Sequence, residues 1–423
     1  MSQPLINITR KQALIFAAFL VLYEFLTYIA NDMIMPGMIK VIESFHGPES
    51  AIATSLTAYL LGGASLQLFL GPISDRYGRR PVMIFGALLF FLCTVFIAIS
   101  NSIDQFLVAR FFQGMGLCFI GVIGYATLQE IFAEMDAIRL IAIMANVSIL
   151  APLLGPLLGA LFIHYYTWRL IFVIIGFFAL FALWGLWRFM PEPVGQVKRD
   201  GEEIKRISLS PRSIVINYKN LLCNRSYIMG SVALGLLGMP CIAWIALSPI
   251  ILVVDAKLSV IQYGLWQLPV FGAAILGNLF LMRMTRKAMV KKIVWFGSII
   301  SVLSLLSLFF LPWLMHASYI WLMPGLIVYF FGLGITGAPL TRLILFSTPV
   351  AKGTTSALMN MIAMCLQALG IEVANILYSS HSNVTFGLYC AVVGMLFGVF
   401  LIGTLFVTTS NKTSQTELNT ITM

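Results

Sequence analysis

The stretch that decides the fold is residues 71–100, GPISDRYGRRPVMIFGALLFFLCTVFIAIS. A basic turn ending at Arg80 is followed by 20 residues without a single charged side chain. At about 1.5 Å per residue, a helix of this length crosses the roughly 30 Å hydrocarbon core of a bilayer. The stretch therefore predicts a transmembrane helix with a charged turn at one membrane face.

The whole chain has the same character. Of its 423 residues, 60% are hydrophobic and 10% are charged, and the mean hydropathy is +0.96. Soluble domains carry about 25% charged residues, so this chain has too few charges to cover a water-exposed surface. The apolar segments are continuous rather than alternating in polarity, which excludes a transmembrane β-barrel. The composition therefore indicates an all-α integral membrane protein.

Apolar runs bounded by charges, proline or glycine predict twelve transmembrane helices in two six-helix bundles. The first run is too long for a signal-peptide core, so we expect it to be a retained helix. The expected domains are residues 1–190, a charged cytoplasmic linker over 191–225, and residues 226–423 with a short cytoplasmic tail. The predicted spans are 12–36, 51–73, 81–100, 104–127, 138–163, 169–189, 226–253, 261–283, 293–314, 319–341, 354–378 and 386–408.

The loop charges predict the orientation. With both termini in the cytoplasm, 22 of the 26 Lys and Arg residues fall on the cytoplasmic side. This distribution fits the positive-inside rule, and the inverted topology would violate it. The net charge of +10 therefore reflects orientation, and no basic patch interleaved with aromatics points to a nucleic-acid partner.

Two acids in the first predicted span are the most informative residues for function. Glu24 and Asp32 are eight residues apart, about 12 Å along a helix. Tyr28 and Asn31 lie on the same helical face. Because charge in the bilayer costs about 2.5–3.5 kcal/mol per residue on insertion scales, this stripe must face a cavity or another helix.

A basic residue and a further acid also lie within predicted spans. Arg110 in span four either neutralises a carboxylate for structural reasons or takes part in a functional site. Desolvation raises the pKa of a carboxylate and a nearby cation lowers it, so two acids and one arginine suit proton exchange against a charged ligand. Glu372 in span eleven is either a third coupling residue or a polar contact between helices.

Other features are less specific. Met144 in span five and the ladder of Tyr263, Gln267 and Phe271 in span eight suit a pocket that adapts to ligands of different shape, or ordinary packing. Span five also carries small residues and two prolines at helical spacing, which permit close helix approach. These are Pro152, Gly155, Pro156 and Gly159.

Several classes of function are excluded by their missing motifs. The chain has no G-x-x-x-x-G-K-[ST], H-E-x-x-H or G-x-S-x-G sequence, so neither nucleotide hydrolysis nor peptidase chemistry has a site. The six cysteines show no C-x-x-C or Cys/His spacing. We therefore expect no enzyme activity, no cofactor and no metal.

Three of these motifs resemble signatures of the major facilitator superfamily, in its twelve-span drug/proton antiporter branch. Residues 71–80 are similar to G-x-x-x-D-R-x-G-R-R, residues 107–114 to the R-x-x-Q-G motif of span four, and residues 151–160 to the antiporter motif of span five. Ala160 stands where that last motif usually has a second glycine. The run from Tyr23 to Gly37, with Arg110 and Gln129-Glu130, resembles one multidrug/proton antiporter type within the branch.

The resemblance implies export of cationic, zwitterionic and neutral drugs in exchange for protons, by alternating access of the two bundles. It implies proton coupling through Glu24 and Asp32, with Arg110 as their electrostatic partner. It also implies a cytoplasmic gate formed by Asp75, Arg79, Glu130 and Arg342. The implied substrate-binding residues are Tyr28, Asn31, Asp32, Leu117, Met144, Ile242, Ile245, Tyr263, Gln267 and Phe271.

An exporter dedicated to one endogenous solute, such as a siderophore, sugar or metabolite, is the alternative, because a fold does not determine a substrate. In either case we expect a multi-pass protein of the bacterial inner membrane. Its partners would be small molecules, protons and the lipid bilayer. No nucleic acid and no obligate protein partner are implied, and we expect a monomer.

Overall fold

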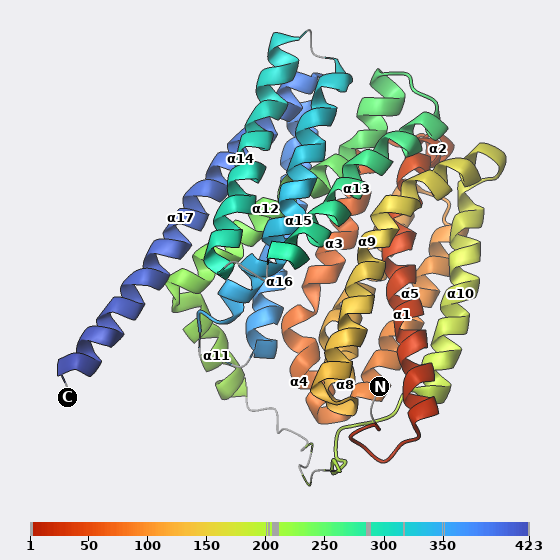
Figure 1. Ribbon diagram of the computed structural model, residues 1–423. Coiled ribbons are helices and arrows are strands. Elements are labelled where there is room, and N and C mark those ends of the chain that lie inside the picture. The colour runs from red at the N-terminus through yellow and green to blue at the C-terminus, as the bar shows by residue number, and fades with distance from the viewer. Residues whose placement is uncertain are drawn as a thin grey trace. The chain divides into compact units, whose positions relative to one another are not determined.

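The computed structural model describes residues 3–199, 201, 204, 211–284, 289–315, 318–348, 350 and 352–421. Side chains 134–135, 138–139, 142, 145–146, 149, 211–214, 352 and 406–421 lie outside this description. Within it the chain is helical and contains no β-strand (Figure 1). Of the linker expected over 191–225, residues 200, 202–203 and 205–210 lie outside the described residues.

The predicted spans agree with the helices. The described residues contain ten helices long and apolar enough to cross a membrane, or eleven when a bent pair is taken as one span. The predicted span 138–163 falls within α9 (Glu134–Tyr165). The part of α9 whose side chains are described without gaps, Leu150–Tyr165, is apolar but shorter than a full membrane span. The all-α, membrane-spanning fold class is therefore confirmed, while the count of twelve stays a prediction.

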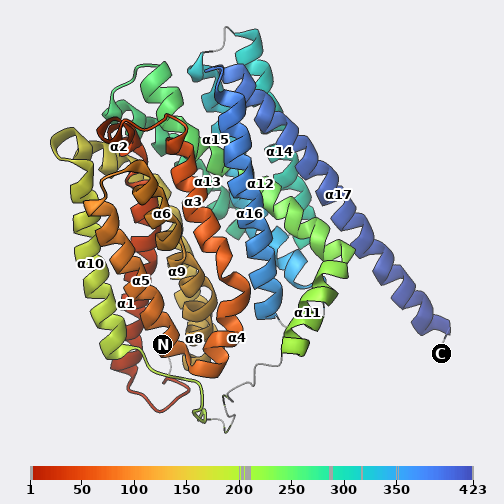
Figure 2. The same ribbon diagram turned by 180° about the vertical axis from the view of Figure 1, so that it is seen from behind.

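The chain divides into two compact units, Met1–Ser210 with Ile245–Leu268, and Pro211–Trp244 with Pro269–Met423. In the first unit the packing neighbours follow the order α3, α6, α5, α10, α1 and α9 (Figures 1 and 2). The helices of this unit are α1 (Arg10–Asp32), α2 (Met38–Phe45), α3 (Ala51–Ser65), α4 (Gln67–Tyr77), α5 (Arg79–Ile99), α6 (Ile103–Gly114), α7 (Gly116–Cys118), α8 (Tyr125–Ile131), α9 and α10 (Trp168–Phe189).

The second unit is built around α14, which packs against α15 and α17, while α16 packs against α17 and α11. Helices α12 and α13 contribute to both units, because the chain from Ile245 to Leu268 groups with the first. The helices that complete the chain are α11 (Pro211–Cys223), α12 (Arg225–Pro249), α13 (Val260–Met284), α14 (Val290–Leu314), α15 (Leu322–Leu345), α16 (Lys352–Tyr378) and α17 (Asn383–Ile421).

The second predicted span, 51–73, is broken rather than continuous. Helices α3 and α4 meet at Leu66 with a bend of 42°. The Cys118 thiol donates to the carbonyl oxygen of Gly63 at 2.6 Å. Pro72 lacks a backbone donor in the following turn. A side chain inserted into the helical ladder and a proline are the usual causes of such kinks.

Two glycines bring the α3 and α6 backbones together. A Cβ on Gly62 would clash with the carbonyl oxygen of Phe111, and one on Gly114 with that of Tyr59. No side chain larger than hydrogen fits at either point. Small residues that allow backbones to approach are typical of membrane helix packing, where no hydrophobic effect drives helices together. This contact places Arg110 of α6 beside α3.

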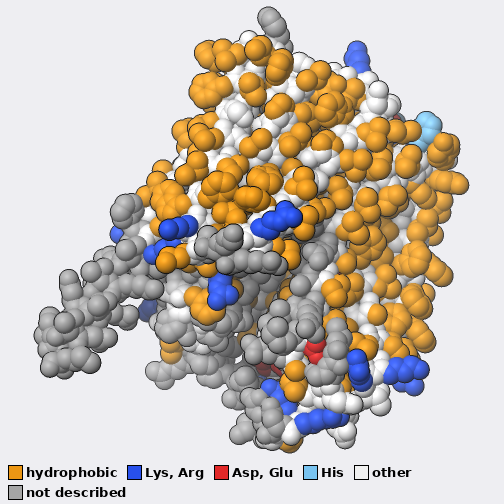
Figure 3. Space-filling model, in the orientation of Figure 1, with side chains coloured by type: hydrophobic (Ala, Val, Ile, Leu, Met, Phe, Trp, Pro, Cys, Tyr) orange, Lys and Arg blue, Asp and Glu red, His pale blue; other side chains and the backbone are white. Residues whose placement is uncertain are grey.

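The outward surface of the helices is apolar. Hydrophobic side chains cover most of the helix length on the face shown in Figure 3. Among the apolar side chains of the described residues, Phe177, Trp187 and Leu303 are each more than half exposed. Such a surface is compatible with lipid and incompatible with water.

Candidate functional site

The acidic stripe of α1 is buried inside the first unit. Glu24 is 1% exposed, Asp32 is 5% exposed and Asn31 is also buried, whereas Tyr28 is half-buried. The polar side chains therefore do not face lipid, as the cost of charge in hydrocarbon requires.

Glu24 has one satisfied oxygen and one without a partner. Its Oε1 accepts hydrogen bonds from the Tyr125 hydroxyl at 2.9 Å and the Ser148 hydroxyl at 3.0 Å. Its Oε2 is buried and has no hydrogen-bond partner among the described residues. A buried carboxylate oxygen without a donor is costly when ionised, so it favours binding either a proton or a positively charged ligand.

Arg110 is fully buried and is held by neutral groups. Its guanidinium donates to Asn31 Oδ1 at 2.5 Å, to Gln113 Oε1 at 2.8 Å and to Ser55 Oγ at 3.3 Å, and it lies 4.5 Å from the centre of the Tyr59 ring. These contacts satisfy a buried cation without requiring a carboxylate.

Asn31 connects Arg110 to Asp32. While its Oδ1 accepts from the guanidinium, its Nδ2 donates to Asp32 Oδ1 at 3.2 Å. Among the described residues Arg110 forms no direct ion pair with Glu24 or Asp32. The two charges therefore communicate through an amide, and the role of Arg110 as electrostatic partner stays a prediction.

The glycines of span five pack against the end of α1. A Cβ on Gly155 would lie 2.7 Å from the Asp32 Cβ, and one on Gly159 would clash with the Met33 carbonyl oxygen. Pro152 and Pro156 lie inside the same helix, α9. The absence of side chains at the two glycines lets α9 approach Asp32 closely.

Three of the four predicted gate residues lie together. Arg79 forms ion pairs with Asp75 at 2.6 Å and with Glu130 at 2.8 Å, and its Nε donates to the second Glu130 oxygen at 3.3 Å. Arg342 lies on α15 in the second unit, with its guanidinium 5.2 Å from the Phe346 ring centre. The planar guanidinium of Arg79, on α5, thus links α4 and α8 to its own helix through charge-assisted hydrogen bonds.

Glu192, which the sequence analysis missed, supports this turn. Its carboxylate accepts from the backbone N–H groups of Arg79 and Arg80, both at 2.9 Å, and of Val194 at 3.1 Å. It therefore caps α5 from outside the helix. Gly78 is needed there, because its φ is +106° and a Cβ would clash with the Glu192 carboxylate.

The fourth span connects the two sites. A π-helical turn, η2 (Phe119–Gly124), separates α7 from α8. Helix α8 then carries both Tyr125, which bonds Glu24, and Glu130, which pairs with Arg79. Such π-helical turns are frequent at functional sites.

The remaining predicted substrate-binding residues are divided between the units. Leu117 and Met144 are buried in the first unit, and the Tyr263 hydroxyl lies 3.3 Å from that of Ser248. Ile245 and Gln267 also belong to this unit, whereas Ile242 and Phe271 belong to the second, where Phe271 packs edge-on to Phe330. Their common role stays a prediction.

Glu372, on α16, has one buried carboxylate oxygen without a hydrogen-bond partner among the described residues. Neither interpretation of this acid is tested.

The fold and the buried polar site define a multi-pass membrane protein with Glu24, Asp32 and Arg110 buried inside an apolar helical unit. Residues 20–371 match the Major Facilitator Superfamily. The chain belongs to this family of transporters.

Its relatives include proteins named multidrug transporter MdfA. The chain is 44% identical to the MdfA of Yersinia pestis bv. Antiqua (strain Angola) over 386 residues, covering 91% of this chain and 92% of that protein. The MdfA of Escherichia coli O157:H7 is 43% identical with the same coverage. The MdfA of Edwardsiella ictaluri (strain 93-146) is 44% identical over 388 residues.

Solved structures share the fold at low sequence identity. The inward-facing, unoccupied crystal structure of a bacterial homolog to the human lysosomal transporter Spinster has a TM-score of 0.70 and 13% identity, covering 95% of this chain and 98% of that chain. The human organic anion transporter MFSD10 has a TM-score of 0.59 and 17% identity, covering 94% of this chain and 99% of that chain.

Proposed function

We propose that this chain is a proton-coupled multidrug efflux antiporter. It exports cationic, zwitterionic and neutral lipophilic compounds by alternating access, and it has no enzyme activity of its own. It acts as a monomer in the bacterial inner membrane, with both termini in the cytoplasm. The names of its relatives and the positive-inside distribution of its basic residues support this proposal.

The observation that carries the proposal is the state of Glu24. This acid is buried, two hydroxyls bond one of its oxygens, and the other oxygen has no partner among the described residues. It has no basic partner within ion-pair distance in that part of the chain either. A proton and a cationic substrate can therefore compete for the same carboxylate, which is the requirement for exchange.

Asp32 and Arg110 complete the proposed coupling site. Because Asn31 holds both residues, binding or loss of a proton at Asp32 changes the electrostatic environment of the buried guanidinium without breaking a direct ion pair. The substrate-binding and gate residues named from the sequence keep their proposed roles.

The test is drug-driven proton release in everted membrane vesicles, followed with a pH-sensitive dye after respiration has acidified the interior. We expect several unrelated drugs to release protons in the wild type, and we expect the response to be lost in Asp32→Asn and Glu24→Gln. Asp104→Asn is the matched control, because Asp104 is an exposed acid at the start of α6.

Proton release by the double variant Glu24→Gln, Asp32→Asn would contradict the coupling role of these acids. If well-inserted wild-type protein responds to no drug in the panel but responds to one metabolite, the dedicated exporter is the correct function.

A further inference from the structure

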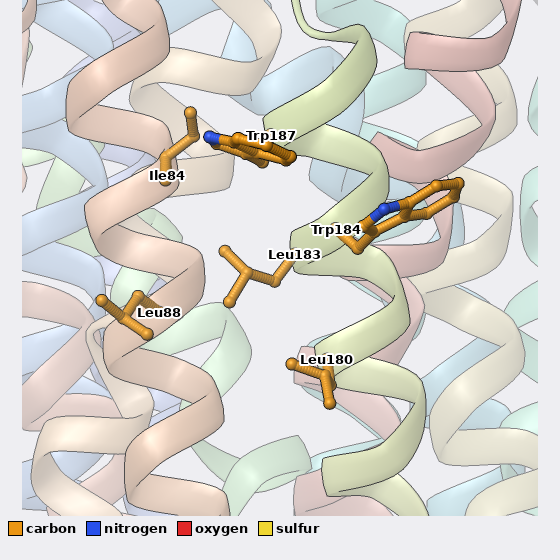
Figure 4. Close-up of a pocket in the computed structure, with 6 residues that line it drawn as sticks. All are labelled: Ile84, Leu88, Leu180, Leu183, Trp184 and Trp187. Atoms are coloured by element: carbon orange, nitrogen blue, oxygen red, sulfur yellow. The ribbon is translucent and has the colours of Figure 1, made fainter.

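A groove lies between α5 and α10, on the outer face of the first unit. Its volume is about 290 Å³, and Figure 4 shows apolar side chains from both helices along it. The lining residues are Ile84, Leu88, Leu180, Leu183, Trp184 and Trp187. Leu88, Leu180, Trp184 and Trp187 are each 40–57% exposed.

The two walls of the groove repeat one pattern. On α5, Arg80, Ile84 and Leu88 follow one another at intervals of four residues, and α10 has Arg188, Trp184 and Leu180 at the same intervals in reverse. Residues four apart share a helix face. Each wall therefore carries an arginine at one end followed by apolar side chains.

A hydrogen bond places Arg80 at one end of the groove, and Arg188 lies in the last turn of α10 at the same end. The Arg80 guanidinium donates to the backbone carbonyl oxygen of Trp187 at 2.7 Å, so it reaches across from α5 to α10. The Arg188 guanidinium lies 5.6 Å from the Phe189 ring centre, and that ring packs edge-on to Trp184 at 6.0 Å.

The positive charge at this end is not neutralised by an ion pair. Neither Arg80 nor Arg188 pairs with an acid among the described residues. Glu192 is close to Arg80, but its carboxylate accepts from three backbone N–H groups. Two cations therefore stand at one end of an apolar groove, where two predicted spans end. Tryptophan is typically enriched at the ends of membrane spans.

We propose that this groove binds an anionic phospholipid, with the phosphate at Arg80 and Arg188 and an acyl chain along the apolar wall. Basic pockets between membrane helices bind anionic headgroups, and tryptophan rings accommodate the polar–apolar boundary. The assignment does not depend on the transport function, because it needs only the arginines and the groove.

Quenching of tryptophan fluorescence by lipids with brominated chains tests the assignment. The full-length protein is reconstituted in phosphatidylcholine bilayers that contain a minor fraction of brominated phosphatidylglycerol or, separately, of brominated phosphatidylcholine. We expect stronger quenching by phosphatidylglycerol. We expect this difference to disappear in Trp184→Phe, Trp187→Phe, because those two rings report on the groove.

The charge variants identify the headgroup site. We expect the preference for phosphatidylglycerol to fall about five-fold in Arg188→Gln, whose side chain is exposed. We expect it to fall further in the double variant Arg80→Gln, Arg188→Gln. Lys291→Gln, Lys292→Gln in the second unit removes the same charge and should retain the preference. Leu88→Phe, which narrows the groove, keeps both arginines and adds no fluorophore, should reduce quenching by both lipids.

Equal quenching by the two lipids would overturn the proposal, since the groove would then hold bulk lipid only. An undiminished preference in the double arginine variant would also overturn it. Quenching by both lipids that weakens as the protein-to-lipid ratio rises would show that a second copy of the chain covers this face instead.

Discussion

Replacing Glu192 by alanine tests whether this residue holds the charged turn that begins α5. The carboxylate accepts from the backbone N–H groups of Arg79 and Arg80 at 2.9 Å and of Val194 at 3.1 Å. Losing a helix cap costs about 0.5–2 kcal/mol. Losing a negative charge at a helix N-terminus costs roughly 0.3–1 kcal/mol more, and the third hydrogen bond contributes about 0.5–1.5 kcal/mol.

These contributions predict a loss of about 2–4 kcal/mol for Glu192→Ala. Glu192→Gln keeps an acceptor oxygen but loses the charge, so we expect about 1 kcal/mol. A unit of this size shifts its thermal midpoint by roughly 2–4 °C per kcal/mol. The alanine variant should therefore unfold about 5–15 °C below the wild type, and the glutamine variant a few degrees below it.

The assay is thermal unfolding of the purified protein in detergent, followed by circular dichroism at one scan rate. Glu43→Ala is the control, because Glu43 is an exposed acid at the end of α2. If Glu192→Ala unfolds at the wild-type midpoint, the capping argument is wrong. It is also wrong if Glu192→Ala and Glu192→Gln lower the midpoint no more than Glu43→Ala does.

Three further outcomes are expected. Gly62→Ala should lower the thermal midpoint, because overpacking against a backbone carbonyl costs about 1–3 kcal/mol. Gly121→Ala should leave the midpoint unchanged, because its new Cβ meets nothing within 4 Å. Equal midpoints for the two variants would contradict this packing. Arg79→Lys should reduce drug-driven proton release about tenfold or more, because an ammonium cannot replace a planar guanidinium that bridges two acids. The control Arg76→Lys, at an exposed arginine, should keep the wild-type proton release. Wild-type release by Arg79→Lys would refute the gate geometry. Tyr125→Phe removes a hydroxyl that donates a hydrogen bond to Glu24. Because a hydrogen bond to a charged group contributes about 1.5–3 kcal/mol, this variant should slow proton release about tenfold at equal expression. An unchanged rate would show that the hydroxyl is dispensable.

Much of the first unit could be predicted from local sequence. The acidic stripe of α1 and the turn from Asp75 to Arg79 were both recognised, and the structure buries the first and joins the second by an ion pair. The pattern of residues 51–73, by contrast, predicted one continuous helix. The break at Leu66 lies next to Gly63, whose carbonyl oxygen accepts a hydrogen bond from the thiol of Cys118, a residue remote in sequence.

The sequence by itself indicated which segments are apolar enough to cross a membrane and which charged residues lie within them, because insertion depends on the summed polarity of about 20 consecutive residues. It could not assign the partners of those charges. Tyr125 and Ser148 reach Glu24 from α8 and α9, and Asn31 stands between Arg110 and Asp32. Only the tertiary structure decided these contacts, because they depend on how each helix is rotated about its axis and how closely its neighbours pack.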